Sequence, residues 1–205
     1  MNIYLKELSK VQNYLIIVSF ILGAYLLSSV PFALLISKLK KIDLRKVGSG
    51  NLGATNVYRA LGFQFAILVF ILDAAKGLIP TYLAMFYFSN PLWHVAIGLV
   101  TIIGHSLSIF VKFKGGKGVA TGLGVIMALN PLVAAILAAL GFASIAITRY
   151  VAPTSIVCAV IAPVLFYFFN SPDEYIIFIS VISTLIIFRH KDNITRLIHG
   201  KENKV

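Results

Sequence analysis

The sequence predicts an all-α membrane protein, a polytopic bundle of about seven transmembrane helices that occupies residues 1–205 as a single domain. Of its 205 residues, 59% are hydrophobic and only 12% are charged, whereas a soluble domain carries about 25% charged residues. So little polar surface cannot cover a water-exposed globule. Lipid must therefore surround much of the protein.

Apolar stretches of membrane-spanning length recur along the chain. About 20 helical residues cross ~30 Å of hydrocarbon, and fewer suffice where the bilayer thins. The stretches are Tyr14–Ser37, Phe63–Phe88, Leu92–Val111, Leu132–Thr148, Thr154–Phe169 and Tyr175–Phe188. Val119–Leu129 is shorter, and we interpret it as a short or tilted span, with a re-entrant helix as the alternative. The first stretch is long and lacks a following small-residue cleavage site, so we do not interpret it as a signal peptide.

The distribution of Lys and Arg predicts the orientation of the chain. If the N-terminus is outside and seven helices cross, fifteen of the eighteen basic residues fall on the inner side. The short outer segments near Ser89–Pro91, Asn130–Pro131 and Asn170–Glu174 contain no Lys or Arg. Cytoplasmic loops of membrane proteins are enriched in these residues, so we expect a cytoplasmic C-terminus. In so apolar a chain, the excess positive charge suits anionic lipids or phosphorylated metabolites rather than nucleic acid.

The first inward loop, Arg45–Arg59, is rich in glycine and in polar side chains. Its glycines let the backbone turn tightly and present N–H groups inward. The hydrogen-bonding and basic side chains are Ser49, Asn51, Thr55 and Asn56, with Arg45 and Arg59 at the two ends. A solvated turn with basic flanks is the alternative. Four polar side chains within eight residues favour an anion-binding site.

The second inward loop contains Gly115-Gly116-Lys117-Gly118 and opens directly onto the apolar stretch Val119–Leu129. A helix N-terminus carries about half a positive charge and unpaired N–H groups, which suit a phosphate. Lys117 adds a full positive charge at the same place. The Walker spacing is absent and no strand precedes the loop, so its likeness to a nucleotide-binding loop is only physical.

Two further inward segments contribute candidate residues. His190, Asn193 and Arg196 follow the last apolar stretch at a spacing of three, and so share one face of a helix. A basic tail that binds anionic lipid would explain the lysines of this segment, but not His190 and Asn193. Arg149, followed by Ser155, would by itself indicate only a basic helix end with a cap.

Asp73 and Lys76 lie three residues apart within the second apolar stretch. Ionisable residues inside a membrane usually pair or face a cavity, so we expect a structural ion pair near the site rather than direct catalysis. No cluster of His, Cys and carboxylates has metal-ligand spacing, and we predict no metal. Cys158 lies in an apolar run where a thiolate is disfavoured.

Three segments together resemble the motifs of one family, the bacterial acyl-phosphate:glycerol-3-phosphate acyltransferases. They are Gly48–Arg59, Gly104–Thr121 and His190–Glu202, in that order and all on the predicted cytoplasmic side. The resemblance implies a seven-helix enzyme of the bacterial cell inner membrane that needs no cofactor. In the implied reaction, an acyl group passes from acyl phosphate to the 1-hydroxyl of glycerol 3-phosphate. The products are 1-acylglycerol 3-phosphate (lysophosphatidate) and inorganic phosphate, the first acylation of phospholipid synthesis.

The resemblance also implies roles for individual residues. The catalytic positions are Ser49, Arg59, Lys117, His190 and Asn193. The substrate-binding positions are Arg45, Asn51, Thr55, Asn56, Gly116, Arg149 and Ser155, the last because Ala152 stands where the family often has serine. Asp73, Lys76 and Glu202 are expected to be structural residues near the site. Whether His190 is a base or a positioning residue stays open.

The implied partners are acyl phosphate, glycerol 3-phosphate, membrane lipid and the enzyme that makes acyl phosphate. We expect the acyl chain to lie in a groove between helices open to lipid, lined by Gly122 and Gly124. Acyltransferases that use acyl-CoA or acyl-carrier protein carry a His-x-x-x-x-Asp motif, which is absent from this sequence. A metal-dependent lipid phosphotransferase would need clustered aspartates, and a transporter commonly shows repeated halves. Neither feature is present in the sequence.

Overall fold

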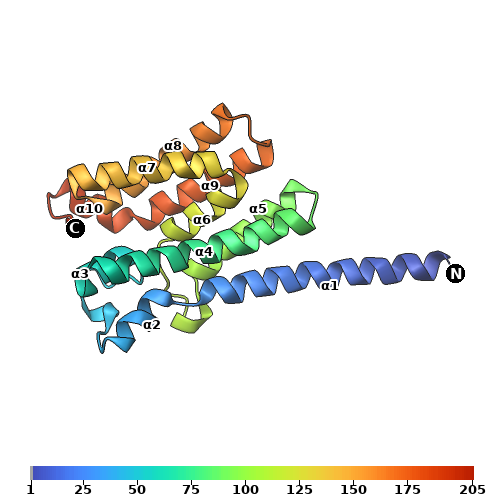
Figure 1. The fold of residues 1–205 in the computed structure, drawn as a ribbon, viewed down its shortest axis with the longest axis horizontal. Coiled ribbons are helices and arrows are strands. Elements are labelled where there is room, and N and C mark those ends of the chain that lie inside the picture. The colour runs from blue at the N-terminus through green and yellow to red at the C-terminus, as the bar shows by residue number, and fades with distance from the viewer. Residues whose placement is uncertain (1) are drawn as a thin grey trace.

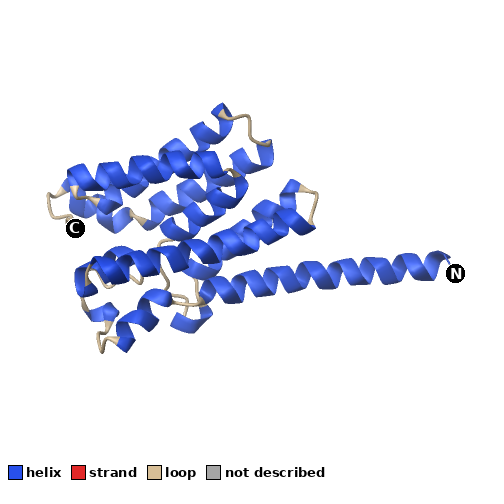
Figure 2. Ribbon diagram, in the orientation of Figure 1, coloured by secondary structure: helices blue, strands red, loops and turns tan. Residues whose placement is uncertain are grey.

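The computed structural model describes residues 2–205, with side chains from Tyr14 onward. Within these residues every secondary-structure element is a helix, and loops connect the helices (Figures 1 and 2). The helical fold class is thus as predicted. The α-helices are α1 (Asn2–Ser29), α2 (Phe32–Leu39), α3 (Ala54–Leu61), α4 (Phe63–Tyr87), α5 (Pro91–Ser106), α6 (Val119–Leu129), α7 (Pro131–Thr148), α8 (Val151–Phe168), α9 (Asp173–Arg189) and α10 (Lys191–Ile198). Two short 3₁₀ helices, Leu44–Lys46 and Ile109–Val111, lie in the first two inward loops.

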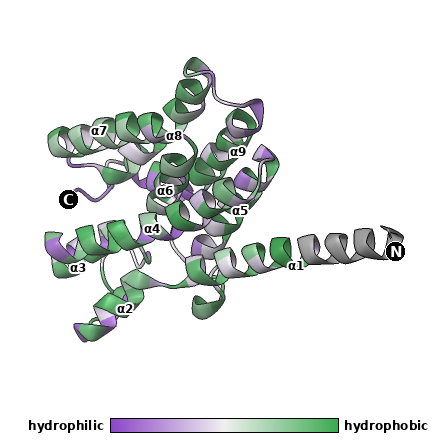
Figure 3. Ribbon diagram, turned by 45° about the vertical axis from the view of Figure 1, so that its right-hand side comes forward, coloured by the Kyte–Doolittle hydropathy of each residue, from purple (hydrophilic) through white to green (hydrophobic). Residues whose placement is uncertain are grey.

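Five helical stretches of the described chain are long and apolar enough to cross a membrane. They are Tyr14–Leu39, Phe63–Tyr87, Pro91–Val111, Pro131–Thr148 and Val151–Phe168. Helix α6 is shorter, and its eleven residues match the short apolar helix expected from the sequence. Apolar side chains such as Phe86, Ile147 and Val164 are exposed on the helix surfaces, and Figure 3 shows that the helices consist mostly of hydrophobic residues.

The first predicted span is interrupted at Pro31. The sequence analysis expected one continuous apolar helix over Tyr14–Ser37, but α1 ends at Ser29 and α2 begins at Phe32. Proline has no N–H for a helical hydrogen bond, and its ring disfavours the helical conformation of the preceding residue. The Val30 carbonyl at the break accepts two hydrogen bonds, from Phe32 N at 3.1 Å and from Lys76 Nζ at 3.0 Å.

Helix α6 lies at the centre of the bundle and packs closely against α4. A Cβ added at Gly77 of α4 would collide with the Thr121 carbonyl, and one at Gly124 of α6 would collide with the Ala74 carbonyl. Close approach of two backbones in a membrane bundle requires such small residues. The expectation that Gly122 and Gly124 line the acyl groove is wrong, because neither borders the cavity described below.

The two ends of the bundle differ. Figure 1 places α3, α10 and the C-terminal residues at one end, and the N-terminal end of α1 with the α4–α5 and α8–α9 turns at the other. The Asn130 Nδ2 group, where α6 meets α7, donates to Ser171 Oγ in the α8–α9 turn at 3.2 Å. The first inward loop and the C-terminal segment lie at the end of the bundle that contains α3 and α10, and Lys117 of the second loop bonds to Asn193 of α10.

Candidate active site

A cavity of about 480 Å³ opens at this end, between the first inward loop, α3, α4, α6, α7, α8 and the α10 segment. Drug-sized ligands occupy pockets of roughly this volume. All five residues predicted to be catalytic line it: Ser49, Arg59, Lys117, His190 and Asn193. Of the predicted substrate-binding residues, Asn51, Thr55, Asn56, Arg149 and Ser155 also line it.

The first loop is held in place by Asn56, which is 1% exposed. Its Oδ1 accepts from Ser49 N at 3.0 Å, and its Nδ2 donates to the Leu44 and Val47 carbonyls, each at 3.0 Å. With these bonds both amide hydrogens are used. Asn56 borders the cavity as predicted, but the contacts favour a role in shaping the loop that presents Ser49.

The second loop is shaped by His105, which is buried at the end of α5. A Cβ at Gly116 would collide with the His105 imidazole, and one at Gly115 would collide with the His105 carbonyl. Arg189 Nη2 donates to the Gly116 carbonyl at 3.0 Å. Gly118, at φ +87°, then begins α6, so that Lys117 projects at the N-terminus of that helix.

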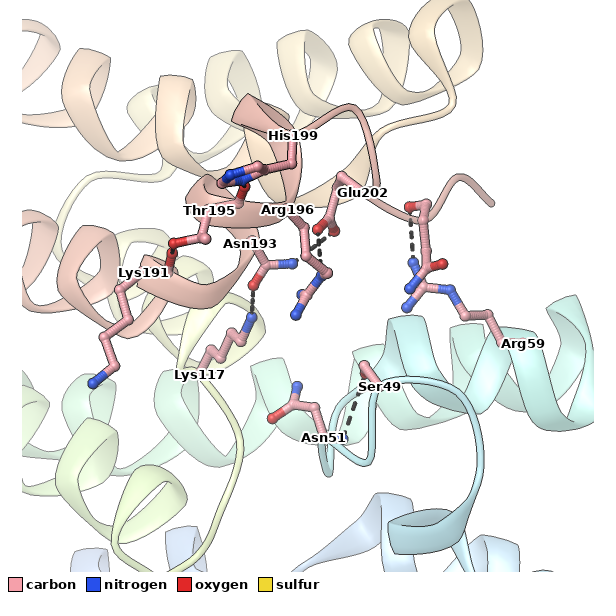
Figure 4. A network of polar contacts seen from close by, with 11 residues as sticks. Ser49, Asn51, Arg59, Lys117, Lys191, Asn193, Thr195, Arg196, His199 and Glu202 are labelled. Atoms are coloured by element: carbon pink, nitrogen blue, oxygen red, sulfur yellow. Dashed lines mark hydrogen bonds and ion pairs between the residues drawn. The ribbon is translucent and has the colours of Figure 1, made fainter.

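A chain of polar contacts joins the second loop to the C-terminal segment (Figure 4). Lys117 Nζ donates to Asn193 Oδ1, and Asn193 Nδ2 donates to Glu202 Oε1 at 2.7 Å. The other carboxylate oxygen of Glu202 accepts from Arg196 Nε at 2.9 Å. Because an ammonium only donates and a carboxylate only accepts, the contacts fix the orientation of the Asn193 amide. Glu202 has the structural position near the site that the sequence analysis expected.

Burial shifts the pKa of Lys117 and of His190. Burial lowers the pKa of Lys117 to about 8, and the Arg196 cation contributes in the same direction. Burial also lowers the pKa of His190, although a hydrogen bond to the Ile186 carbonyl opposes this. His190 Nδ1 lies 2.7 Å from that carbonyl, which can only accept. The neutral imidazole therefore carries its proton on Nδ1 and leaves Nε2 as an acceptor.

The main chain of the C-terminal segment contacts two arginines that border the cavity. Arg59 Nη2 donates to the Asn203 carbonyl at 3.0 Å, and Arg149 Nε donates to the Val205 carbonyl at 2.6 Å. Burial lowers the pKa of Arg59, but a guanidinium stays charged in proteins. Each arginine has five N–H donors, so donors remain for an anion in the cavity.

A buried polar cluster lies beneath the loops. Lys76 Nζ and Asp73 Oδ1 are 2.7 Å apart, and both side chains are 3% exposed. They form the ion pair that the sequence analysis expected. His105 Nδ1 lies 3.7 Å from the same carboxylate oxygen. Lys76 also bonds to the Val30 carbonyl and lies outside the large cavity, so the cluster connects the break between α1 and α2 to the floor of the site.

Two predicted substrate-binding residues lie elsewhere. Arg45 is exposed and does not line the cavity, and its backbone N–H bonds to Asp43 Oδ1 at 3.2 Å. Gly116 is buried against His105 and the Leu52 carbonyl. Only glycine lets the backbone at position 116 come this close to His105 and Leu52. The geometry therefore favours a packing role for Gly116.

The deeper part of the cavity is an apolar arm between α4, α6, α7 and α8. Its lining side chains include Ala66, Ile67, Phe70, Leu123, Leu137, Ala138, Phe142, Ile145 and Cys158. The arm continues directly from the polar end, where Lys117, Arg59 and Arg149 supply positive charge. One continuous cavity therefore combines a cationic mouth with a hydrocarbon-like interior.

A model of the glycerol-3-phosphate acyltransferase family matches residues 18–200 of this chain. The chain belongs to this family. A glycerol-3-phosphate acyltransferase of Aquifex aeolicus is 43% identical over 185 residues, which cover 90% of this chain and 96% of that protein. The corresponding protein of Endomicrobium trichonymphae is 45% identical over 193 residues, covering 93% and 96% of the two chains.

Two crystal structures of PlsY (YgiH), an integral membrane glycerol 3-phosphate acyltransferase, share the fold of this family member. Its glycerol 3-phosphate form matches with a TM-score of 0.89 and 42% identity, over 92% of this chain and 95% of that one. Its lysophosphatidic acid form matches with a TM-score of 0.86 and 40% identity, over 92% and 94% of the two chains. The predicted family and the helical membrane fold class are confirmed. The number of crossings and their orientation stay predictions.

Some residues of this acyltransferase site were missed by the sequence analysis. His105 belongs to the second motif, but its role against Gly115 and Gly116 depends on a contact across the loop that residue types alone do not reveal. Arg189 received no role in the sequence analysis, yet it bonds to the Gly116 carbonyl. The bonds that Arg59 and Arg149 form with the Asn203 and Val205 carbonyls have no sequence signal, because any residue supplies a backbone oxygen.

Proposed function

We propose that this acyltransferase transfers a fatty acyl group from acyl phosphate to the 1-hydroxyl of glycerol 3-phosphate. The products are 1-acylglycerol 3-phosphate and inorganic phosphate. The observation that carries the proposal is the continuity of the cationic mouth with the apolar arm. An acyl phosphate has the same two parts, an anionic head and a hydrocarbon tail, and the second substrate brings another phosphate to the mouth.

The cations of the mouth hold the two anionic reactants together. Lys117 lies at the N-terminus of α6, where backbone N–H groups also favour an anion, and Arg59 faces it from α3. Orientation of two reactants in a pocket contributes roughly 7–11 kcal/mol to lowering a barrier. Phosphate is a good leaving group of the mixed anhydride. Orientation of the reactants and stabilisation of their charges therefore account for most of the lowering of the barrier.

The bond changes follow from the chemistry of the mixed anhydride. The hydroxyl oxygen of glycerol 3-phosphate attacks the acyl carbonyl carbon, and the bond between that carbon and the phosphate oxygen breaks. Ser49, Asn193 and the loop N–H groups are the donors proposed for the carbonyl oxyanion. One well-aimed donor is worth roughly 3–4 kcal/mol. The hydroxyl proton goes to His190 Nε2 or to an oxygen of the departing phosphate.

A His190→Gln variant distinguishes these two proton acceptors. Glutamine can still hydrogen-bond to a substrate, but it cannot take a proton at neutral pH. If His190 is the base, kcat falls by about 10²–10⁴-fold, as measured by phosphate release at saturating substrate. Near-normal kcat with a raised KM would contradict the base and leave a positioning role.

The donor itself is tested with purified protein, glycerol 3-phosphate and palmitoyl phosphate. We expect lysophosphatidate and inorganic phosphate in equal amounts, measured by mass spectrometry and a phosphate assay. Palmitoyl-CoA in place of palmitoyl phosphate is the control, and we expect no product from it. Product from palmitoyl-CoA alone would overturn the proposed donor while leaving glycerol 3-phosphate as the acceptor.

We place the reaction at the cytoplasmic face of a bacterial inner membrane, where the basic loops are predicted to lie. The acyl-phosphate-producing enzyme is the partner proposed from its chemistry, because a lipid-soluble, hydrolysable donor favours direct delivery. The absence of a histidine-aspartate acyltransferase motif from the sequence supports a donor other than acyl-CoA.

A further inference from the structure

The wall of the apolar arm contains a glycine, Gly141 of α7. A Cβ added there would lie 3.7 Å from Cys158 Sγ and 4.0 Å from Thr154 Cγ2, both ordinary van der Waals distances. The same addition at Gly124 would collide with the Ala74 carbonyl. Helix packing therefore requires glycine at position 124 but not at position 141.

Glycine inside a helix is about 0.5–1 kcal/mol less stable than alanine, so its presence at position 141 needs another reason. The space that a side chain would fill at this position belongs to the arm, whose wall continues through Cys158 and Leu137. The missing side chain thus enlarges the arm rather than allowing two backbones to approach each other.

Gly141 lies part-way along the arm, next to Phe142. It precedes the end of α7, at Thr148, by seven residues, or about 10 Å at 1.5 Å per residue. Phe70 lies seven residues after the start of α4, at the same depth. The rings of Phe70 and Phe142 meet edge to face with centroids 5.8 Å apart, so they connect α4 and α7 beside Gly141. Leu137 lies beyond this point, about 6 Å deeper.

We propose that Gly141 sets the acyl-chain length that the enzyme accepts. This inference rests on the proposed function, because it assigns the arm to the acyl chain of the donor. A chain whose head lies at Lys117 must pass the Phe70–Phe142 pair to reach Leu137. Glycine at position 141 leaves space on the side of Cys158 and Thr154 of α8, and a larger residue there fills this space and stops the chain at the pair.

The test compares Gly141→Leu and Gly141→Ala with the unaltered protein, using acyl phosphates of 8 to 16 carbons and saturating glycerol 3-phosphate. Burial of each methylene group contributes about fourfold to binding. Exclusion of two methylenes by Gly141→Leu therefore lowers the ratio of kcat/KM for the 16-carbon donor to that for the 8-carbon donor by about fifteenfold. Gly141→Ala shifts the same ratio in the same direction by a smaller factor.

The matched control is Gly23→Leu in α1. A Cβ at Gly23 has no atom within 4 Å, and this residue lies outside the cavity, so the chain-length ratio stays unchanged. An unchanged ratio in both Gly141 variants, or an equal loss for all donors, overturns the inference. If Gly141→Leu fails to fold in a thermal unfolding assay, Gly141→Ala decides the question.

A wrong donor in the proposed function gives a different experimental result from a wrong role of Gly141. If the unaltered protein forms no lysophosphatidate from any acyl phosphate but does so from an acyl-CoA or acyl-carrier protein, the donor is wrong. The chain-length ratio is then measured with the donor that works. A shifted ratio with that donor supports the role of Gly141 independently of the leaving group.

Discussion

The Asn193 amide lies between Lys117, which can only donate, and Glu202, which can only accept. An Asn193→Asp variant keeps the shape and still accepts from Lys117, but it places two carboxylates 2.7 Å apart. Loss of a hydrogen bond to a charged group is worth about 1.5–3 kcal/mol, so we expect kcat/KM to fall roughly ten- to a hundredfold. A Glu202→Gln change in the same chain supplies a new donor and restores most of the activity.

The control for this rescue is Asn193→Asp with Asp192→Asn. It restores the same net charge from an exposed neighbouring residue, and we expect no recovery. Comparable recovery in both double variants would show that net charge matters, rather than the Asn193–Glu202 bond. A cycle of single and double variants isolates the pairwise term.

We expect Lys117 to make substrate binding depend on pH. Burial lowers the pKa of Lys117 to about 8, so the ammonium is charged below this pH and loses its proton as the pH rises through it. We expect KM for the anionic substrates to rise above pH 8, by up to about tenfold per pH unit. In a Lys117→Arg variant the cation persists, so the rise should vanish. The same rise in both proteins would assign the titration to another group.

Residue types revealed much of the site because its chemistry is local. Ser49 and Lys117 stand in polar, glycine-rich loops, and His190 and Asn193 in a polar segment, of an otherwise apolar chain, and such contrasts are visible in a sequence. Which polar residue faces the cavity and which holds the loop depends on side-chain contacts. Asn56 and Arg45 look equally suitable in the sequence, yet Asn56 bonds to three backbone groups and Arg45 lies outside the cavity.

At the scale of helices, the two glycines of α6 are expected to respond in opposite ways to the same substitution. Gly124→Ala introduces a Cβ that collides with the Ala74 carbonyl and lies 2.9 Å from Leu78 N, and overpacking typically destabilises by about 1–3 kcal/mol. Gly122→Ala brings its Cβ to an ordinary 3.6 Å from Ile186 Cδ1 and gains up to about 1 kcal/mol of helix propensity.

Thermal unfolding in detergent measures the difference between these two variants. The Tm should fall for Gly124→Ala and rise or stay level for Gly122→Ala. Equal changes in Tm would contradict the close packing of α4 on α6. This packing also explains an error of the sequence analysis. A glycine next to an active-site loop suits a groove or a helix contact equally well, and only the position of the neighbouring backbone decides between them.

The break at Pro31 shows a similar limit of sequence interpretation. Apolar residues on both sides of the proline suggest one continuous span, since helices in membranes tolerate proline where other groups satisfy the freed carbonyl. Here the Leu27 carbonyl, which loses its helical partner at Pro31, accepts from Val30 N at 3.2 Å, and Lys76 Nζ bonds to the neighbouring Val30 carbonyl at 3.0 Å. The partner lies 46 residues away in the sequence, so hydropathy could locate the apolar stretch but not its interruption.

At the scale of the whole molecule, the shared cavity constrains how the chain crosses the bilayer. Arg59, Lys117, Arg149 and Glu202 border one cavity, so each must lie on the same side as the others. Between each of these four residues and the next one along the chain, the chain must therefore cross the bilayer an even number of times. Helices α4 and α5 separate the first two, and α8 and α9 the last two. Between Lys117 and Arg149, we therefore predict that α6 crosses with α7, despite a length of only about 16 Å.

Cysteine labelling tests this topology in a Cys158→Ala background, which removes the single native cysteine. Ser89→Cys and Asp173→Cys mark predicted outer turns, and Lys114→Cys and Lys201→Cys mark predicted inner segments. All four positions are exposed. We expect a membrane-impermeant maleimide to label the first two in intact cells and the other two only after permeabilisation.

A re-entrant α6 gives a different labelling pattern. It would return the chain to the inner side at Asn130 and invert every later crossing, so that Lys201→Cys would label in intact cells and Asp173→Cys would not. Lys114 would stay protected in either case. The contact between His94 Nδ1, near the start of α5, and the Tyr175 hydroxyl, near the start of α9, at 2.6 Å favours the crossing form, because it places the α8–α9 turn beside the α4–α5 turn. Labelling of Lys201→Cys in intact cells would contradict both this form and a site built from loops on one side of the membrane.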